Sequence, residues 1–227
     1  MKRFGIFAKY WTPGAVKTRL AKVVGPLAAS RIHLAFVECV IERLGRVADE
    51  RILAFAPADR KREFAELAGE RFDVAPQRGD DLGQRMEWFF QAAFADGAES
   101  VVLIGSDSPT LPVGYVEQAF DALQNTPVVL GPATDGGYYL VGARGKTPPI
   151  FSDMPWSEES LWDRTMDRLR EHNTPCAVLP SWPDVDEYED LSRLMDELNK
   201  ADPVRDAAEC ALRERLAEIL KPSPPDP

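Results

Sequence analysis

The chain has 227 residues, a net charge of −10, three cysteines and two histidines. A chain of this length can bury its own core without disulfide bonds, and no CxxC pair or other zinc-like Cys/His spacing occurs. The negative charge argues against nucleic-acid binding. The sequence contains no apolar stretch of about 18 residues, the length that would predict a membrane span. Because the cysteines are scattered and no signal-peptide pattern is present, we expect a cytoplasmic protein.

Positive charge is concentrated near the N-terminus. Seven lysines and arginines precede the first acidic residue, Glu38. A local basic segment in an acidic chain favours a small anionic ligand such as a phosphate group. An ordinary solvated surface is the alternative interpretation.

Short apolar runs and amphipathic stripes alternate along the chain, which predicts alternating strands and helices. In chain order we predict a strand at 3–8, a loop at 9–25, a helix from Pro26, a strand at 51–56, a helix at 59–68, a helix from Asp81, a strand at 101–104, a helix at 115–123, strands at 127–130 and 138–141, a helix at 158–170, a strand at 176–179, and helices at 187–199 and 204–220.

This alternation predicts a three-layer α/β/α sandwich with a mainly parallel, mixed sheet. In such folds ligands bind beyond the carboxyl ends of the strands. We expect one domain over residues 1–221, followed by a Pro-rich tail at 222–227 whose composition is typical of disorder.

The first candidate binding segment, KYWTPGAVKTRL at residues 9–20, follows the first predicted strand. Pro13 and Gly14 predict a turn, and Gly14 lets the backbone approach a ligand closely. Lys9, Lys17 and Arg19 can then neutralise a diphosphate, although the spacing is not that of a P-loop. The alternative is an ordinary exposed loop.

The second segment, QRGDDLGQRM, begins at residue 77. Asp81 and Gln84 have capping-box spacing, which predicts the start of a helix. Gly79 and Arg85 lie at this helix start, and we predict that they contact a nucleotide.

The third segment, GSDSPTLP, directly follows the apolar strand at 101–104. A carboxylate in this position faces the crevice outside the sheet, so we predict that Ser106 and Asp107 contact the nucleotide. Asp107 can also bind Mg²⁺ or Mn²⁺, because such an ion takes one or two carboxylates plus phosphate oxygens. The alternative is that Asp107 or Ser108 caps a turn.

The fourth segment, GPATDGGYYLVG, lies between two predicted strands. Its glycines, Gly136 and Gly137, leave room for a sugar or an acceptor, and Asp135 can hydrogen-bond the hydroxyl groups of that ligand. A simple hairpin turn explains the Asp-Gly pair equally well.

Two later segments add further candidates. Trp156 is a candidate wall of an acceptor pocket, with ordinary packing as the alternative. Asp184 and Asp186 alternate along an extended segment and so share a face, and one of them can complete a metal site with Asp107. Asp186 and Glu189 also have capping-box spacing, which predicts that Asp186 caps a helix.

His33 falls within a predicted helix, and His172 lies near the end of another. No Ser/His/Asp arrangement accompanies them, so we interpret both as structural or solvated.

The ordered set of motifs resembles a bacterial family of GT-A-type glycosyltransferases in the nucleotide-diphospho-sugar transferase superfamily, some of them linked to arsenosugar biosynthesis. The matching stretches are FAKYWTPGAVKTRL, QRGDDLGQRM, GSDSPTLP, GPATDGGYYLVG, MPWSEESL and DVDEYEDL. Their order is also similar to nucleotidyltransferases of this superfamily, such as phospholactate guanylyltransferase and the molybdenum-cofactor nucleotidyltransferases. The resemblance implies a GT-A/Rossmann-like fold.

The resemblance also implies roles for two aspartates. Asp107 matches the metal-binding acidic motif, although here that motif reads Asp-Ser-Pro instead of Asp-x-Asp. Asp186 matches the second acidic position that many relatives use.

From these observations we predict metal-dependent glycosyl transfer from a nucleoside diphosphate sugar to a small-molecule acceptor. Lys17 and Arg19 would stabilise the leaving diphosphate, and Asp135 would orient the sugar or acceptor. Asp135, Glu158 and Glu159 are candidates for a general base. The alternatives are nucleotidyl transfer, in which an NTP and a phosphorylated small molecule release pyrophosphate, and nucleotide binding without catalysis. Homodimer formation is left open.

Overall fold

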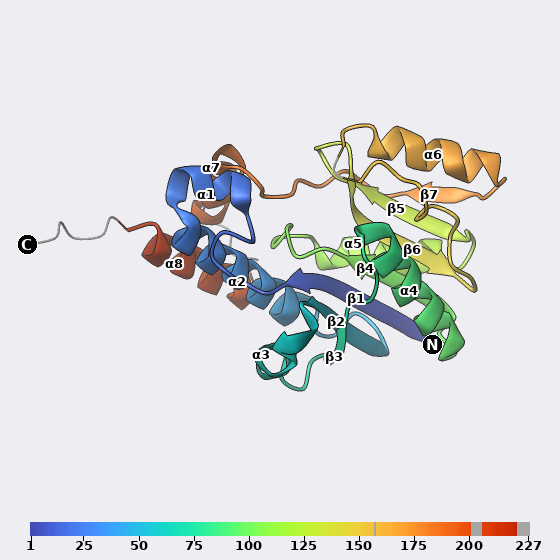
Figure 1. The fold of residues 1–227 in the computed structure, drawn as a ribbon, viewed down its shortest axis with the longest axis horizontal. Helices are drawn as coiled ribbons and strands as arrows, with labels where there is room; N and C mark the ends of the chain where they lie inside the picture. The colour runs from blue at the N-terminus through green and yellow to red at the C-terminus, as the bar shows by residue number, and fades with distance from the viewer. Residues whose placement is uncertain (157, 201–205, 222–227) are drawn as a thin grey trace, which may run out of the picture.

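The computed structural model describes residues 1–156, 158–200 and 206–221. The predicted disordered tail at 222–227 lies outside the described residues. Seven strands form one mixed sheet (Figure 1). The strands are β1 (Lys2–Lys9), β2 (Glu50–Ala56), β3 (Asp73–Pro76), β4 (Ser100–Ile104), β5 (Val128–Pro132), β6 (Tyr138–Arg144) and β7 (Cys176–Val178).

The sheet has the order β3-β2-β1-β4-β6-β5-β7. Strand β6 runs antiparallel to both of its neighbours, and all the other pairs are parallel. The prediction of a mainly parallel, mixed sheet is therefore confirmed. The central strand β4 has four consecutive buried residues, as its uninterrupted apolar sequence requires of a strand covered on both faces.

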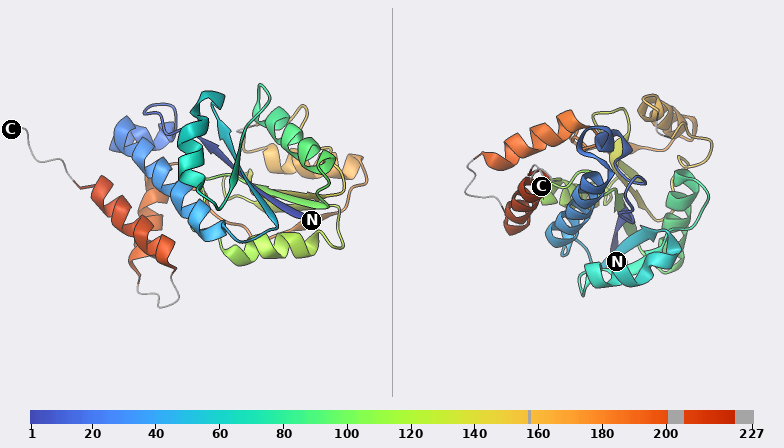
Figure 2. Two further views of the ribbon diagram at one scale, coloured as in Figure 1. Left: turned by 90° about the horizontal axis from the view of Figure 1, so that it is seen from below. Right: turned by 60° about the vertical axis from the view of Figure 1, so that its left-hand side comes forward.

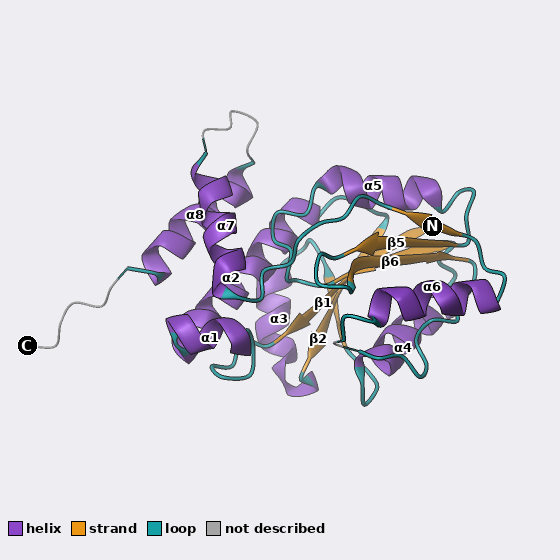
Figure 3. Cartoon of the chain, turned by 90° about the horizontal axis from the view of Figure 1, so that it is seen from above, coloured by secondary structure: helices purple, strands orange, loops and turns teal. Residues whose placement is uncertain are grey.

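The helices cover both faces of the sheet (Figure 3). Helices α2, α3 and α5 pack on one face in a shared core cluster, and α4 and α6 pack on the other. The helices are α1 (Thr18–Val24), α2 (Pro26–Leu44), α3 (Lys61–Ala68), α4 (Leu82–Ala95), α5 (Val113–Ala122), α6 (Leu161–Glu171), α7 (Tyr188–Asn199) and α8 (Ala207–Ile219), with a short 3₁₀ helix at Ala58–Arg60. None of the helices in the described ranges is long and apolar enough to cross a membrane.

A third apolar cluster joins α1, α2, α7 and α8 beside the sheet (Figure 2). Leu20 of α1, Phe36 of α2 and Leu191 of α7 are all buried in it. The cluster also contains Val185, which precedes α7. Packing in this cluster therefore brings residues near position 17 close to residues near position 185.

The structure differs from the sequence predictions in three places. The predicted loop at 9–25 contains the short helix α1, and the edge strand β3 was missed. The capping box of α7 is formed by Glu187 and Asp190, so the prediction that Asp186 and Glu189 form it was wrong. The Asp186 carboxylate is instead paired with Lys17, which leaves the next residue to cap the helix.

Two glycines at matching positions of different helices offer a test of the packing. Gly83 and Gly114 are each the second residue of their helix, α4 and α5. A Cβ added at Gly83 would lie 2.2 Å from the carbonyl oxygen of Phe151 and 2.7 Å from the Trp156 indole nitrogen, whereas one added at Gly114 would meet nothing within 4 Å.

We therefore expect Gly83→Ala to destabilise the protein by about 1–3 kcal/mol, because backbone atoms would have to move apart. Gly114→Ala should be neutral or should stabilise by up to about 1 kcal/mol through helix propensity. Urea denaturation of both variants measures the difference. Equal stability of the two variants would contradict the close packing of α4 against Phe151.

Candidate functional site

A cavity of about 640 Å³ opens at the carboxyl ends of the central strands. Its wall combines Lys9 at the end of β1, Ser106 and Asp107 after β4, and Arg85 of α4. Trp156 also lines this cavity. The fold thus brings together, around one cavity, residues from several segments that the sequence singled out.

The candidate residues of the turn after β1 differ in whether they line the cavity. Lys9 lines the cavity, but Pro13 and Gly14 are exposed and are not part of its wall. Gly14 has a φ of 81°, which explains why a glycine suits this turn. Arg19 lines a neighbouring cavity, where it pairs with Glu187 at 3.6 Å. Lys17 differs from all of these because its side chain is almost completely buried.

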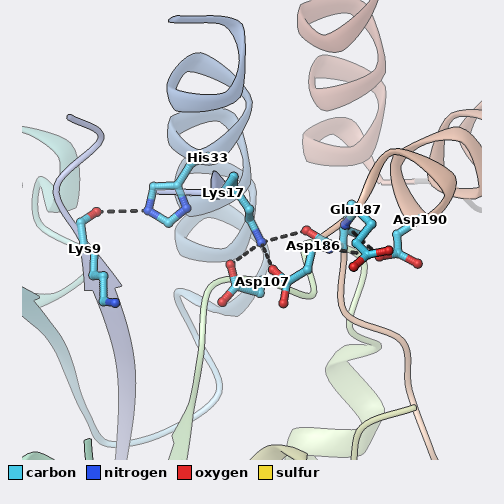
Figure 4. A network of polar contacts seen from close by, with 8 residues as sticks. Lys9, Lys17, His33, Asp107, Asp186, Glu187 and Asp190 are labelled. Atoms are coloured by element: carbon cyan, nitrogen blue, oxygen red, sulfur yellow. Dashed lines mark hydrogen bonds and ion pairs between the residues drawn. The ribbon is translucent and has the colours of Figure 1, made fainter. Parts of the chain in front are cut away.

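The Lys17 ammonium lies between two carboxylates (Figure 4). Its Nζ contacts Asp107 Oδ1, lies 2.9 Å from Asp186 Oδ1, and donates a hydrogen bond of 2.7 Å to the carbonyl oxygen of Val185. An ammonium has three N–H groups, so these contacts use all of them. The Lys17 side chain is 2% exposed, whereas those of Asp107 and Asp186 are 46% and 40% exposed.

These contacts keep the groups ionised. Burial by itself lowers the pKa of Lys17, but the Asp107 and Asp186 carboxylates outweigh it and hold the pKa above its usual value. For the Asp107 carboxylate, burial acts in the opposite direction and raises the pKa. The Lys17 ammonium outweighs this effect and holds the pKa of Asp107 below its usual value. The result is a charged cluster of one cation and two carboxylates at the cavity wall.

His33 is a cavity residue that the sequence analysis missed. It is 4% exposed, and its Nε2 lies 3.0 Å from the carbonyl oxygen of Lys9. Because a carbonyl can only accept, Nε2 carries the hydrogen, and Nδ1 is an acceptor that finds no partner among the described residues. Burial lowers the pKa of His33, which keeps the ring neutral. The only sequence signal was its place on the helix that follows the basic segment.

The segment at 77–86 forms another wall of the first cavity. Arg85 Nε donates to the carbonyl oxygen of Gly79 at 2.9 Å, and Asp81 accepts the Gln84 backbone N–H at 2.8 Å, as its capping position predicted. Gly79 has a φ of 130° and packs against the Arg85 backbone. Gln77 also lines the cavity, although the sequence analysis did not select it.

A second cavity of about 420 Å³ adjoins the first, and both contain Asp107 and Asp186 in their walls. Its other acidic residues come from the β5–β6 connection, the segment before α6 and the segment before α7. The ionisable residues in its wall are Arg19, Asp107, Asp135, Glu158, Glu159, Asp184 and Asp186. Among the described residues of this wall, Arg19 is the one cation beside six acidic side chains, two of which also pair with Lys17, so acidic groups are in excess.

Asp184, in the wall of this cavity, has a raised pKa. Burial, followed by the nearby charges of Asp135 and Asp186, raises the pKa of Asp184 to about 6. Such a carboxylate can take up a proton near neutral pH. From the sequence, Asp184 was predicted only as a metal ligand, because its burial cannot be read from its neighbours in the chain.

The DGG motif lies in the connection between β5 and β6, so the hairpin interpretation applies to it. Asp135 Oδ1 accepts the backbone N–H of Gly137 at 2.9 Å, and both residues line the second cavity. Gly136 has a φ of 92°, and an added Cβ there would lie 2.5 Å from the Glu159 carbonyl oxygen. The turn therefore serves the hairpin and also faces a cavity.

Trp156 lies outside this motif. It packs edge-on against Tyr138 and contributes to the first cavity.

The donor set at Asp107 and Asp186 suits a divalent cation of the Mg²⁺ type. Two partly exposed carboxylates face the same space and already hold one cation, the Lys17 ammonium. Within the part of the chain that the structure describes, no three His, Cys, Asp or Glu side chains form a metal-binding group. A metal here would therefore have two protein ligands and would need oxygens from a substrate, which is common for Mg²⁺.

The protein has a nucleotide-diphospho-sugar transferase fold of the GT-A/Rossmann-like type, in which helices cover both faces of a mixed seven-stranded sheet. The chain belongs to the family described as "Uncharacterized protein conserved in bacteria (DUF2064)", which matches residues 40–158. No curated protein matches the sequence.

The similar solved structures include one close relative. A protein from Desulfovibrio desulfuricans G20, provisionally described as a nucleotide-diphospho-sugar transferase, is 36% identical, with 96% of each chain covered and a TM-score of 0.87. CMP:2-keto-3-deoxy-manno-octonic acid synthetase complexed with CTP is 15% identical, with 85% of this chain and 96% of that chain covered and a TM-score of 0.56. Rv0371c from Mycobacterium tuberculosis H37Rv, in complex with manganese, is 17% identical, with coverage of 86% and 99% and a TM-score of 0.50. The two distant structures share the fold.

The neutral, buried state of His33 predicts a pH-dependent stability. Its pKa in the folded protein lies below the ordinary value of 6.5, so the stability it contributes is present above that value and is lost as the pH falls below it. We expect the melting temperature of the unmodified protein to fall more steeply than that of His33→Phe between about pH 7 and pH 5. Thermal unfolding at several pH values measures both slopes, and parallel curves would contradict the neutral state of His33.

Proposed function

We propose that the protein transfers a glycosyl group from a nucleoside diphosphate sugar to a hydroxyl-bearing acceptor, with the help of a divalent metal ion. The observation that carries this proposal is the division of the cleft into two adjoining cavities that share Asp107 and Asp186. The provisional description of the relative from Desulfovibrio desulfuricans supports the same class of donor.

The first cavity suits the nucleotide and its phosphates. Lys9 and Arg85 line it, and Lys17 lies at its wall beside Asp107. Lys9 and Arg85 can bind phosphate oxygens directly, Arg85 with its planar fork and Lys9 as a point charge. Arg19, at the second cavity, can approach the leaving diphosphate from the other side.

The second cavity suits a neutral or cationic acceptor rich in hydroxyl groups. Six acidic side chains line it against Arg19 and the Lys17 ammonium that pairs with Asp107 and Asp186, so acidic groups remain in excess and a phosphorylated acceptor would meet repulsion there. This argues against nucleotidyl transfer to a phosphorylated small molecule. Carboxylates are good acceptors of hydrogen bonds from sugar hydroxyl groups, and Asp135 can orient such a ligand.

A metal ion held by Asp107 and Asp186 would supply charge stabilisation for the departing diphosphate. The remaining steps belong to side chains. Arg19 and Lys17 add positive charge as the negative charge on the leaving group develops. Among the acidic residues of the second cavity, Asp184 is the preferred proton acceptor for the acceptor hydroxyl, because its pKa of about 6 lies near neutral pH.

A ligand screen tests the class of donor. We expect nucleoside diphosphate sugars to raise the melting temperature only when Mn²⁺ is present, and turnover to release a nucleoside diphosphate. Asp107→Asn should abolish the metal-dependent shift and lower turnover by about 10²-fold or more. The control is Asp121→Asn, an exposed aspartate of α5 outside both cavities, which should behave like the unmodified protein.

Other outcomes of the screen would replace the proposal. A shift with NTPs alone, together with release of pyrophosphate, would identify a nucleotidyltransferase. Tight binding of a nucleotide without turnover of any donor would identify a nucleotide sensor.

The identity of the base can be tested within the second cavity. We expect Asp184→Asn to lower kcat by about 10²–10⁴-fold and to remove the fall of kcat/KM below a pH of about 6. Matched variants Asp135→Asn, Glu158→Gln and Glu159→Gln should lose less activity and should keep that fall. A larger loss in any of these three would assign the base to that residue.

A further inference from the structure

The place between Asp107 and Asp186 already holds a cation. Lys17 Nζ contacts Asp107 Oδ1 and lies 2.9 Å from Asp186 Oδ1. All three of its N–H groups are used when the bond to the Val185 carbonyl is included. While Lys17 holds this position, it has no N–H group left for a phosphate oxygen.

A divalent ion that used the same two carboxylate oxygens would need the same space. Mg²⁺ binds oxygen at about 2.0–2.1 Å, so a metal ion held by both carboxylates would need the space that the Lys17 ammonium occupies. A metal ion and the Lys17 ammonium so close to each other would also repel each other strongly. Occupation by the ammonium and occupation by the metal ion therefore exclude each other.

The backbone at Lys17 is held in an unfavourable conformation. Lys17 has a φ of 47° and a ψ of 46°, the left-handed region, at the residue that precedes α1. A non-glycine residue adopts this region at a cost and remains there when surrounding contacts hold it. The contacts of the ammonium with Asp107, Asp186 and Val185 provide such a restraint. Release of the side chain would remove that restraint and free the turn after β1.

We propose that Lys17 is the resident counter-ion of the Asp107–Asp186 pair, and that a divalent metal ion binds this pair only after Lys17 has left it. This inference rests on the metal role in the proposed function. A diphosphate in the first cavity gives the released ammonium a new anionic partner. Metal and diphosphate therefore bind together, and the carboxylates are never left without a cation.

Binding of Mn²⁺ to the nucleotide-free protein tests this directly, by electron paramagnetic resonance of the unbound ion. Lys17→Met empties the position between the carboxylates, so we expect it to bind Mn²⁺ at least tenfold more tightly than the unmodified protein. Lys22→Met removes the same charge from an exposed site on α1, the helix that Lys17 precedes, and it should bind Mn²⁺ as the unmodified protein does. The double variant Lys17→Met/Asp107→Asn should lose the gain.

Two further measurements keep the test decisive. If Lys17→Met does not fold alone, added Mn²⁺ should restore a cooperative thermal transition, and failure to do so would overturn the inference. In a folded variant, Mn²⁺ affinity within twofold of the unmodified protein, or weaker, would also overturn it. The measurement uses no sugar donor, so a failure of the glycosyltransferase proposal in the ligand screen would leave this result intact.

Discussion

The cleft depends on one buried ammonium group. Lys17 joins the turn after β1, the loop after β4 and the segment before α7, because its Nζ contacts Asp107, Asp186 and the Val185 carbonyl. A backbone hydrogen bond of 3.0 Å from Val185 N–H to the Asp107 carbonyl joins two of these segments again. A buried cation without partners would be costly, so the fold requires both carboxylates beside it. The same requirement gathers the charges that a phosphate-transferring or diphosphate-releasing enzyme needs.

The two cavities follow from this arrangement. Asp107 and Asp186 lie in the wall that both share, and the side chains beyond them differ in charge. The first cavity contains Lys9 and Arg85, whereas the second has an excess of carboxylates. Burial, together with the nearby charges of Asp135 and Asp186, raises the pKa of Asp184 to about 6. In the proposed function, this difference in charge would orient a nucleoside diphosphate sugar, with its anionic end in the first cavity, beside a neutral, hydroxyl-rich acceptor in the second.

Most strands and helices could be predicted because their apolar periodicity is local. The features that were missed depend on distant partners. Helix α1 is short and begins directly after Lys17, which Asp107 and Asp186 hold in place. Strand β3 is a short edge strand whose pairing with β2 gives it its structure. Asp186 has the spacing of a helix cap, but pairing with Lys17 occupies its carboxylate. His33 has an ordinary helical position, and its contact with the Lys9 carbonyl arises from the packing of α2 beside β1.

The sequence by itself determined the alternation of strands and helices, the resulting class of fold, and the segments that lie at the carboxyl ends of the strands. These properties follow from hydrophobic periodicity and from the backbone preferences of glycine and proline, which act over a few residues. Only the tertiary structure decided that Lys17 faces two carboxylates, that Asp184 titrates near neutrality and that His33 lines the cleft. Ion pairing and desolvation act through space, so residues separated by more than 160 positions can set each other's charge only once the chain has folded.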